Sequence, residues 1–398
     1  MNKKEMTTKK NAKWPTFLLD VLICSLGAYG GPEAHYGVFT EQMVIKKQYL
    51  NEDELLELIA LTGILPGPSS TQTIAAIGYK VGGPGLALLT LIVWALPVLI
   101  IMTILSFMSQ ILSALNISTN GLRYIGPMAV GFIAVASYRL SKKVIIDKKT
   151  LFLFIMGAVI TYFIQKPWIY PAVLITGGVI SIIATKEKNI WNMVKITPPW
   201  HFLAILIIFA LGSVMLTMIF RNIVFDLFAS FYRFGYLVIG GGQVVVPMMF
   251  SELVEIKQYM SSQEFLTGFG LVQGLPGPMF SFSAYAGGIA AQSSGYLIQI
   301  IAALASGLAI FLPGILLIFF VYPVWNQLKE IKAIKISLSG ITAVAAGLIA
   351  ASAITLMQRS GITIENTLIV LMTSSLLLSR KILAPLIVLA VIIIGFVL

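Results

Sequence analysis

The sequence contains few of the residue types on which most enzymes and metalloproteins depend. Its 398 residues include one cysteine, two histidines and only 11% charged residues. A single cysteine, Cys24, excludes an internal disulfide and a cysteine metal cluster, and two histidines exclude a histidine-rich metal site. No Gly-x-x-x-x-Gly-Lys-Ser/Thr motif is present, which argues against ATP-driven transport by this chain alone. We therefore expect no catalytic residues, no metal and no cofactor.

The composition is instead that of a membrane protein. Hydrophobic residues make up 58% of the chain, whereas soluble domains carry about 25% charged residues. The net charge of +11 is scattered over short loops, which indicates membrane topology and not nucleic-acid binding. A span needs roughly 20 apolar residues, and this criterion predicts an all-α polytopic protein of about thirteen spans. The predicted spans are 15–31, 55–80, 84–108, 122–140, 150–165, 168–185, 202–220, 225–241, 265–290, 296–320, 337–357, 364–379 and 382–398.

The chain also repeats itself. Leu65-Pro66-Gly67-Pro68 recurs 210 residues later as Leu275-Pro276-Gly277-Pro278, and Gly30-Gly31 recurs at the same offset as Gly240-Gly241. Ala129-Val130-Gly131 matches Ala345-Ala346-Gly347 at an offset of 216, so about six residues entered the second copy. A duplicated membrane chain with Gly/Pro breaks at matching places predicts a substrate site between the halves. We expect a basic tail at 1–13, a first repeat at 14–200, a linker span at 201–221 and a second repeat at 222–398.

The distribution of lysine and arginine predicts the topology. If the N-terminus is cytoplasmic and all thirteen segments cross, 20 of the 27 basic residues lie inside. A re-entrant second segment would move the cluster from Arg139 to Lys149 outside. We therefore predict that 55–80 and 265–290 cross as broken helices. The lone span at 202–220 then makes the second half inverted relative to the first, as in many transporters.

The first Pro-Gly-Pro sequence carries the chemistry. Two prolines remove backbone donors and break the helix, so a new helix starts near Ser69 with free N–H groups and the positive end of its dipole. Ser69-Ser70-Thr71-Gln72 at this start predicts a socket for a small anion. The alternative is that the prolines only kink the helix and the hydroxyls satisfy freed carbonyls. The second copy retains only Ser281 and Ser283, so we expect the first half to be the main ligand-binding side.

Charged residues at membrane depth are the other candidates. Arg123 and Arg233 would supply positive charge to an anion path, with snorkelling to the interface as the alternative for Arg123. Asp20 and Asp226 would carry a coupling proton or pair with an arginine. His35 titrates in a useful range, although a structural role is the alternative. The candidate substrate-binding residues are Gly30, Gly31, Pro32, His35, Pro66, Gly67, Pro68, Ser69, Ser70, Thr71, Gln72, Arg123, Arg233, Gly240, Gly241, Gly242, Gln273, Pro276, Gly277, Pro278, Ser281 and Ser283.

At these motifs the chain resembles the chromate ion transporter family in its long two-domain form. The resemblance rests on Gly30-Gly31-Pro32-x-Ala34-His35, on Leu65 to Gln72 with Ile77-Gly78-Tyr79, and on Gly240-Gly241-Gly242, Pro247 and Gln273-Gly274-Leu275-Pro276-Gly277-Pro278. One departure is Gly63, because members often carry glutamine there, as Gln273 does in the second copy.

The resemblance implies a multi-pass carrier in the cytoplasmic membrane that exports chromate and so gives chromate resistance. The membrane potential or a proton gradient, as in an antiporter, would drive it. A homodimer is compatible with this reading. Chromate is a tetrahedral dianion similar to sulfate, so uptake of sulfate or another oxyanion is the first alternative. A membrane scaffold or enzyme, in which the Gly/Pro breaks serve packing only, is the second.

Overall fold

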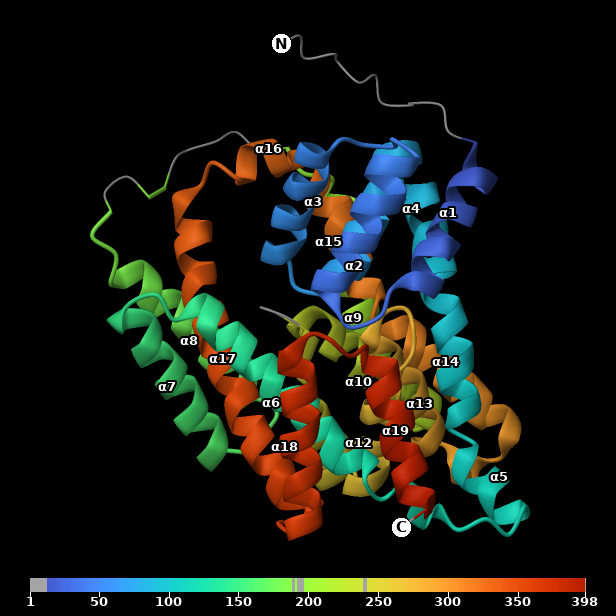
Figure 1. Cartoon of the computed structure of the whole chain (residues 1–398). Coiled ribbons are helices and arrows are strands. Elements are labelled where there is room, and N and C mark those ends of the chain that lie inside the picture. The colour runs from blue at the N-terminus through green and yellow to red at the C-terminus, as the bar shows by residue number, and fades with distance from the viewer. Residues whose placement is uncertain (1–12, 188–189, 192–196, 239–241, 398) are drawn as a thin grey trace.

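The computed structural model describes residues 13–187, 190–191, 197–238 and 242–397, and all regular structure in these ranges is helical (Figure 1). The chain is therefore all-α, as the sequence predicts. Four helical segments of the described ranges are long and apolar enough to cross a membrane. They are Ser69–Leu105, Trp200–Phe220, Tyr296–Leu328 and Lys332–Ser360.

The helices fall into two sets separated by one long helix. The first set comprises α1 (Trp14–Gly27), α2 (Pro32–Phe39), η1 (Thr40–Lys46), α3 (Glu52–Ile64), α4 (Ser69–Leu105), α5 (Met108–Ala114), η2 (Thr119–Leu122), α6 (Ile125–Val144), α7 (Lys148–Phe163) and α8 (Ile169–Ile183). Helix α9 (Trp200–Phe220) follows. The second set comprises α10 (Ile223–Leu237), η3 (Gly242–Val245), α11 (Val246–Phe250), η4 (Ser251–Ile256), α12 (Ser262–Val272), η5 (Met279–Ser281), α13 (Phe282–Ala290), η6 (Gln292–Ser294), α14 (Tyr296–Ala309), α15 (Leu312–Val321), η7 (Tyr322–Val324), α16 (Trp325–Leu328), α17 (Lys332–Ser360), α18 (Ile364–Ser379) and α19 (Ala384–Val397).

The two sets match in local detail. Each contains a π-helical segment, η1 or η4, at corresponding positions. Each π-helix is followed by a left-handed glutamine, Gln48 with φ 54° and Gln258 with φ 52°, which are 210 residues apart. The next helix of each set begins with a capping box, at Asn51 and at Ser261. The second set therefore repeats the unusual backbone features of the first.

Helix α1 and the α2–η1 segment form an antiparallel hairpin. Helix α1 has 14 residues, which corresponds to about 21 Å and is too short for a hydrocarbon core of about 30 Å. The rings of Phe17 and Tyr49 lie 5.0 Å apart at the open end of this hairpin. The segment predicted at 15–31 therefore turns back at Gly30-Gly31, and the return helix is one that the sequence analysis did not predict.

Helix α3 and the first part of α4 form a second hairpin with the Pro-Gly-Pro loop at its tip. Lys80 Nζ lies 2.7 Å from Glu54 Oε1 at the open end, and the hydroxyls of Thr62 and Thr73 lie 2.8 Å apart near the tip. The prediction that 55–80 crosses as a broken helix is wrong, because its two arms run antiparallel.

The same prediction for 265–290 is wrong too, because α12 and α13 fold back on each other, and a Cβ added to Gly268 of α12 would lie 2.2 Å from the Tyr285 ring of α13. The second half also repeats the first hairpin, since Asp226 of α10 lies 2.6 Å from Lys257, which follows η4.

Helix α4 itself reverses at two glycines. Gly82 and Gly83 have non-helical backbone angles, with φ 75° at Gly83. Trp94 Nε1 donates to Thr71 Oγ1 at 3.1 Å, which places the part of α4 after the glycines alongside the part before them. Residues 84–105 alone correspond to about 33 Å of helix and are long enough to cross.

The last three long helices of each set form a separate bundle. Helix α17 packs against α6, α7 and α8, and α18 packs against α6 (Figure 1). Close approach depends on glycine at the crossings, since a Cβ on Gly347 would lie 2.1 Å from the Phe154 carbonyl oxygen and one on Gly340 would lie 2.2 Å from the Gly177 carbonyl oxygen.

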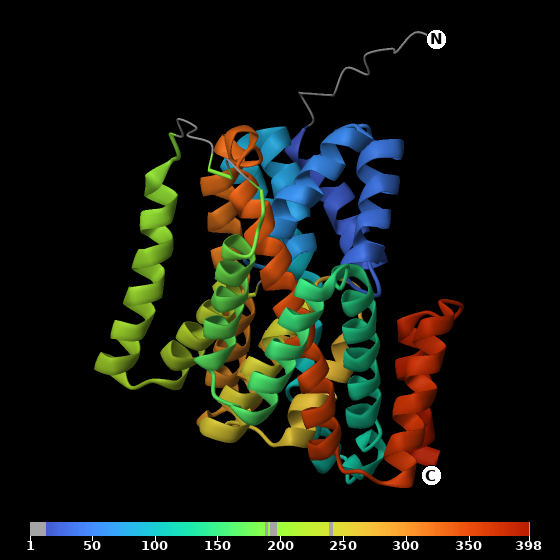
Figure 2. The same ribbon diagram turned by 90° about the vertical axis from the view of Figure 1, so that its left-hand side faces the viewer.

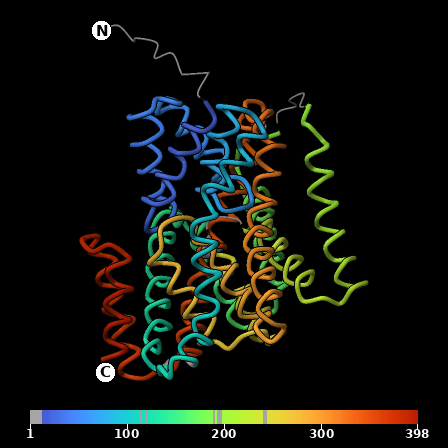
Figure 3. The backbone as a smooth tube through the Cα atoms, turned by 90° about the vertical axis from the view of Figure 1, so that its right-hand side faces the viewer, coloured from blue at the N-terminus to red at the C-terminus, as the bar shows by residue number. Residues whose placement is uncertain are grey.

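The remaining helices form a core beside this bundle. Figure 1 shows α1 to α3 at one end of the core and α10, α12 and α13 toward the other. Helix α9 stands at the edge of the molecule (Figure 2), with only Ser213 of its residues buried. Helix α1 begins near the upper end of the molecule and α19 ends near the lower end (Figure 3).

Candidate substrate site at the hairpin tips

The Pro-Gly-Pro loops of the two halves are joined to each other's first helix. Gly67 N donates to the Val238 carbonyl at 2.7 Å, and Gly277 N donates to the Ala28 carbonyl at 2.8 Å. Ala28 and Val238 are the C-caps of α1 and α10. All four residues are related by the offset of 210, so the two hydrogen bonds are reciprocal. The structure thus brings Pro66-Gly67-Pro68 and Pro276-Gly277-Pro278 to the junction of the halves.

Polar side chains of the first half gather behind this junction. Ser70, Thr71 and Gln72 are each at most 5% exposed, and Ser69 is half-buried. His35 Nδ1 lies 2.9 Å from Ser70 Oγ, which connects the first turn of α2 to the first turn of α4. The α4 start after Pro68 and the α2 start after Gly31 therefore lie close together, and both present the positive end of a helix dipole.

Trp94 completes this cluster. Its indole ring is fully buried, lies 5.4 Å from the His35 ring and donates to Thr71 Oγ1. Sequence reasoning missed Trp94, because a tryptophan within an apolar segment gives no signal that distinguishes it from lipid-facing or core tryptophan.

Gln72 fastens the first loop to α15. Its Nε2 donates to the Pro66 carbonyl at 2.8 Å and to the Gly314 carbonyl at 3.2 Å. Its Oε1 is buried and has no hydrogen-bond partner among the described residues. A buried polar atom normally has a partner in the protein or in ordered water, so this oxygen is an available acceptor beside the loop.

The second half offers fewer polar groups. Phe280 and Phe282 stand at the positions of Ser70 and Gln72. Ser281 Oγ is buried without a hydrogen-bond partner in the described part of the chain, and Ser283 Oγ donates to the Phe280 carbonyl at 2.7 Å. Gln273 Nε2 contacts Met279 Sδ at 3.4 Å. Gly240 and Gly241 lie outside the described residues, and Gly242 begins η3.

The two arginines predicted to supply positive charge, Arg123 and Arg233, contact other groups than the Ser70–Gln72 cluster. Arg123 is exposed and its guanidinium carbon lies 4.7 Å from the centre of the Tyr124 ring. Arg233 forms an ion pair with Glu252 on η4. Arg233 therefore already has an anionic partner within its own hairpin, at a site separate from the Ser70–Gln72 cluster.

The two predicted aspartates pair with lysines and not with an arginine. Asp20 is 1% exposed, accepts from Gln42 Nε2 at 2.8 Å and Tyr49 OH at 2.7 Å, and lies 3.1 Å from Lys47 Nζ. Asp226 similarly lies 2.6 Å from Lys257 Nζ and accepts from Tyr259 OH at 2.7 Å.

These two networks differ by an exchange between the repeats. Asp20 and Gln42 correspond at the offset of 210 to Ser230 and Glu252. In the second half, position 230 has therefore lost its carboxylate, Asp226 lies one turn earlier on α10 and pairs with Lys257, and Glu252 on η4 adds a second carboxylate, with its Oε1 3.4 Å from Lys257 Nζ. Writing the repeats one above the other at this offset would have revealed the exchange from sequence alone.

Within the described ranges, no group of three His, Cys, Asp or Glu side chains is placed to hold a metal ion. The chemistry at the hairpin tips is that of backbone N–H groups, hydroxyls and one amide.

Comparison with known proteins adds the family. A family model described as "Chromate transporter" matches residues 16–182 and 225–396. The chain is 25% identical to the "Chromate transport protein" of Cupriavidus metallidurans, over 96% of this chain and 94% of that protein. It is 26% identical to the "Probable chromate transport protein" of Synechococcus elongatus, over 91% and 90% of the two chains, and 26% identical to an "Uncharacterized transporter" of Methanocaldococcus jannaschii, over 99% and 97%. No solved structure matches significantly.

Proposed function

This chain belongs to the chromate transporter family, and from that premise we propose that it is a secondary transporter that exports chromate across the cytoplasmic membrane. The observation that carries the proposal is the pair of reciprocal hydrogen bonds between the Pro-Gly-Pro loops and the opposite halves. These bonds join each Pro-Gly-Pro tip to the first helix of the opposite half, and helix breaks that lie between two repeats are where secondary transporters bind substrate.

We propose that the substrate binds beside the first tip. The hydroxyls of Ser70 and Thr71 and the N–H groups at the starts of α2 and α4 are donors, and chromate has only acceptor oxygens when fully ionised. Two helix dipoles pointing at one dianion stabilise it without an obligatory countercharge. Gly30, Gly31 and Gly67, all at positive φ, keep the backbone free of Cβ atoms where it faces the ligand. Gln273, Ser281 and Ser283 would complete the site from the second half.

Alternating access is proposed to come from inverted repeats. Helix α1 runs from the upper end of the molecule toward its middle, and α10 runs from the lower end toward the middle (Figures 1 and 2). Two similar halves in opposite orientation can exchange conformations around a fixed site. In this scheme the first repeat is residues 14–200, the linker span 201–221 and the second repeat 222–398.

Export is the favourable direction for an anion. A dianion leaving a cell that is negative inside moves down its electrical gradient, at about 2.3 kcal/mol per charge per 100 mV. The N-terminus is proposed to be cytoplasmic, because the ends of α6 and α18 that carry Arg139, Lys142, Lys143 and Arg380 then face inward. A proton gradient is the second proposed driving force.

Everted membrane vesicles test this proposal. Respiration should drive uptake of radiolabelled chromate into vesicles that contain the protein, and a Thr71→Ala, Gln72→Ala double variant should lose most of it. Competition by excess sulfate would show that the site recognises the tetrahedral shape and double negative charge that sulfate shares with chromate. Uptake no greater than that of empty vesicles would overturn the chromate proposal, and sulfate would be tested next in right-side-out vesicles.

A further inference from the structure

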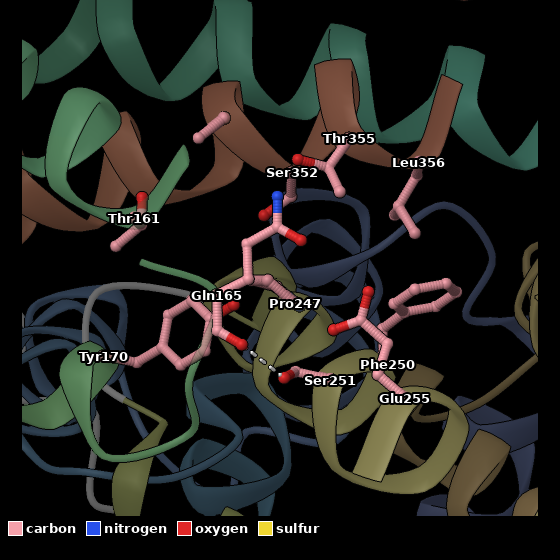
Figure 4. Close-up of a pocket in the computed structure, with 11 residues that line it drawn as sticks. Thr161, Gln165, Tyr170, Pro247, Phe250, Ser251, Glu255, Ser352, Thr355 and Leu356 are labelled. Carbon is pink, nitrogen blue, oxygen red and sulfur yellow. Dashed lines mark hydrogen bonds between the residues drawn. The ribbon is translucent and has the colours of Figure 1, made fainter. Parts of the chain in front are cut away.

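Two cavities lie at equivalent places in the two repeats, and they differ in size and charge. The first lies between α6, the end of α18 and the first turn of α2, and it includes Glu33, Arg139 and Arg380. The second lies between α17, the end of α7 and the α11–η4 segment, and it includes Pro247, Thr355 and Glu255 (Figure 4). Arg139 and Thr355 are related by the offset of 216. Both cavities therefore separate the core of one repeat from the bundle.

The first cavity is large and basic. Its volume is about 470 Å³, and Arg139, Lys142, Lys143 and Arg380 line it with Glu33 as the one carboxylate. Arg139 Nη2 donates to the Leu377 carbonyl at 2.7 Å, which holds the end of α6 against the end of α18. Lys142, Lys143 and Arg380 are exposed. Glu33 is the second residue of α2, so the cavity reaches the helix start that follows Gly30-Gly31.

The second cavity is small, and no lysine or arginine lines it. Its volume is about 20 Å³, enough for about one water molecule. Ser251 Oγ donates to the Gln165 carbonyl at 2.9 Å across it, and Figure 4 shows the Gln165 and Tyr170 side chains beside this contact. Glu255 lines the cavity and forms an ion pair with Arg359 at 2.7 Å. The basic cavity is thus the larger of the two and reaches the start of α2, whereas the second cavity holds about one water molecule and has no basic lining.

We propose that Arg139, Lys142, Lys143 and Arg380 form a cationic vestibule that captures a tetrahedral oxyanion and delivers it to the start of α2. This inference rests on the proposed transport function and deepens it, because it names the side from which the anion enters the protein. A funnel lined by one sign of charge raises the local concentration of the opposite ion, and the effect weakens as salt screens it. The neutral counterpart across the molecule lacks this attraction, so release there is favoured over recapture.

The same four side chains could instead bind the phosphate of an anionic lipid, and the test must separate the two ligands. We would reconstitute the full chain into liposomes of phosphatidylcholine alone and, in parallel, with phosphatidylglycerol added, and measure the KM for chromate from both sides. The variant is Lys142→Gln, Lys143→Gln, Arg380→Gln. The control is Arg221→Gln, because Arg221 and Arg380 are both left-handed C-caps of apolar helices, with φ 47° and 56°.

In phosphatidylcholine at low salt, the triple variant should raise the KM on the vestibule side about tenfold, and the difference should shrink to about threefold or less near 0.5 M salt. The KM from the other side, kcat and the control should stay near the parent values. An unchanged KM would overturn the vestibule, as would an effect that appears only with phosphatidylglycerol. Neither of these two results would contradict the proposed transport of chromate. That proposal is contradicted only if the parent protein transports no chromate in the same liposomes.

Discussion

Gly67 shows how a single residue can determine the geometry of the hairpin tip. Its φ of 130° is unfavourable for any residue with a side chain, and a Cβ there would lie 2.6 Å from Gln72 Nε2 and 3.2 Å from the Gly314 Cα. Gly67→Ala should therefore destabilise the protein by about 1–3 kcal/mol and displace Gln72. Thermal unfolding in detergent measures the first effect, and chromate transport measures the second.

Gly63 is the matched control for this substitution. It lies in α3, four residues before Gly67, and an added Cβ would have no atom within 4 Å. Gly63→Ala should leave stability unchanged or raise it by about 0.5–1 kcal/mol, because alanine favours the helix. Equal losses in both variants would contradict the role assigned to Gly67.

The sequence singled out His35, Ser70, Thr71 and Gln72 as candidates, but it predicted neither Trp94 nor the contacts among these residues. Ser70 and Thr71 follow from the broken helix, because a proline pair fixes where the new helix starts. Their contacts to His35 and Trp94 depend on how three helices pack, and one sequence does not encode that packing in any local pattern.

At the scale of the helical elements, the Asp20 network holds η1 against α1. Asp20→Ser should leave Tyr49 and Lys47 without their carboxylate and cost about 2–4 kcal/mol. Adding Gln42→Glu puts a carboxylate on the π-helix, where the second half has Glu252 beside Lys257, so the double variant should recover part of the loss. Folded yield and thermal unfolding in detergent measure both. No recovery would show that the two networks are not equivalent.

The topology error at this scale has a clear cause. The positive-inside count rejected a single re-entrant segment, because one lost crossing reverses the side of every later loop. The structure has two fold-back hairpins in each half, and two lost crossings restore the original sides. Only Lys46, Lys47 and Lys257 change sides. Charge counting is therefore insensitive to paired hairpins, whereas the short 14-residue α1 and the Gly82-Gly83 reversal were features that helix length could have revealed.

At the scale of the whole molecule, the unequal cavities predict unequal chemical access. Cysteine introduced by Glu33→Cys should react with a water-soluble thiol reagent, and cysteine introduced by Ser352→Cys should not, because Ser352 is 4% exposed and lines the small cavity. The native Cys24 is buried and should not react with the reagent. Labelling of both positions at the same rate would contradict this difference in access.

The sequence repeat has counterparts in the structure. Two motifs at one offset anticipated the matching π-helices, left-handed glutamines and capping boxes. The split into a core and a bundle was not anticipated, because it depends on glycine crossings such as Gly340 with Gly177, which resemble ordinary small residues until the partner helix is known.

Oxyanions are proposed to pass between the two halves beside the Pro-Gly-Pro tips, and chromate counterflow in proteoliposomes of the purified protein measures this passage. Liposomes loaded with unlabelled chromate should transiently accumulate labelled chromate without any added energy source, sulfate should compete, and the Thr71→Ala, Gln72→Ala variant should lose the exchange while remaining folded. Counterflow that survives in this variant would contradict the site, and its absence from the parent protein would contradict chromate as the substrate.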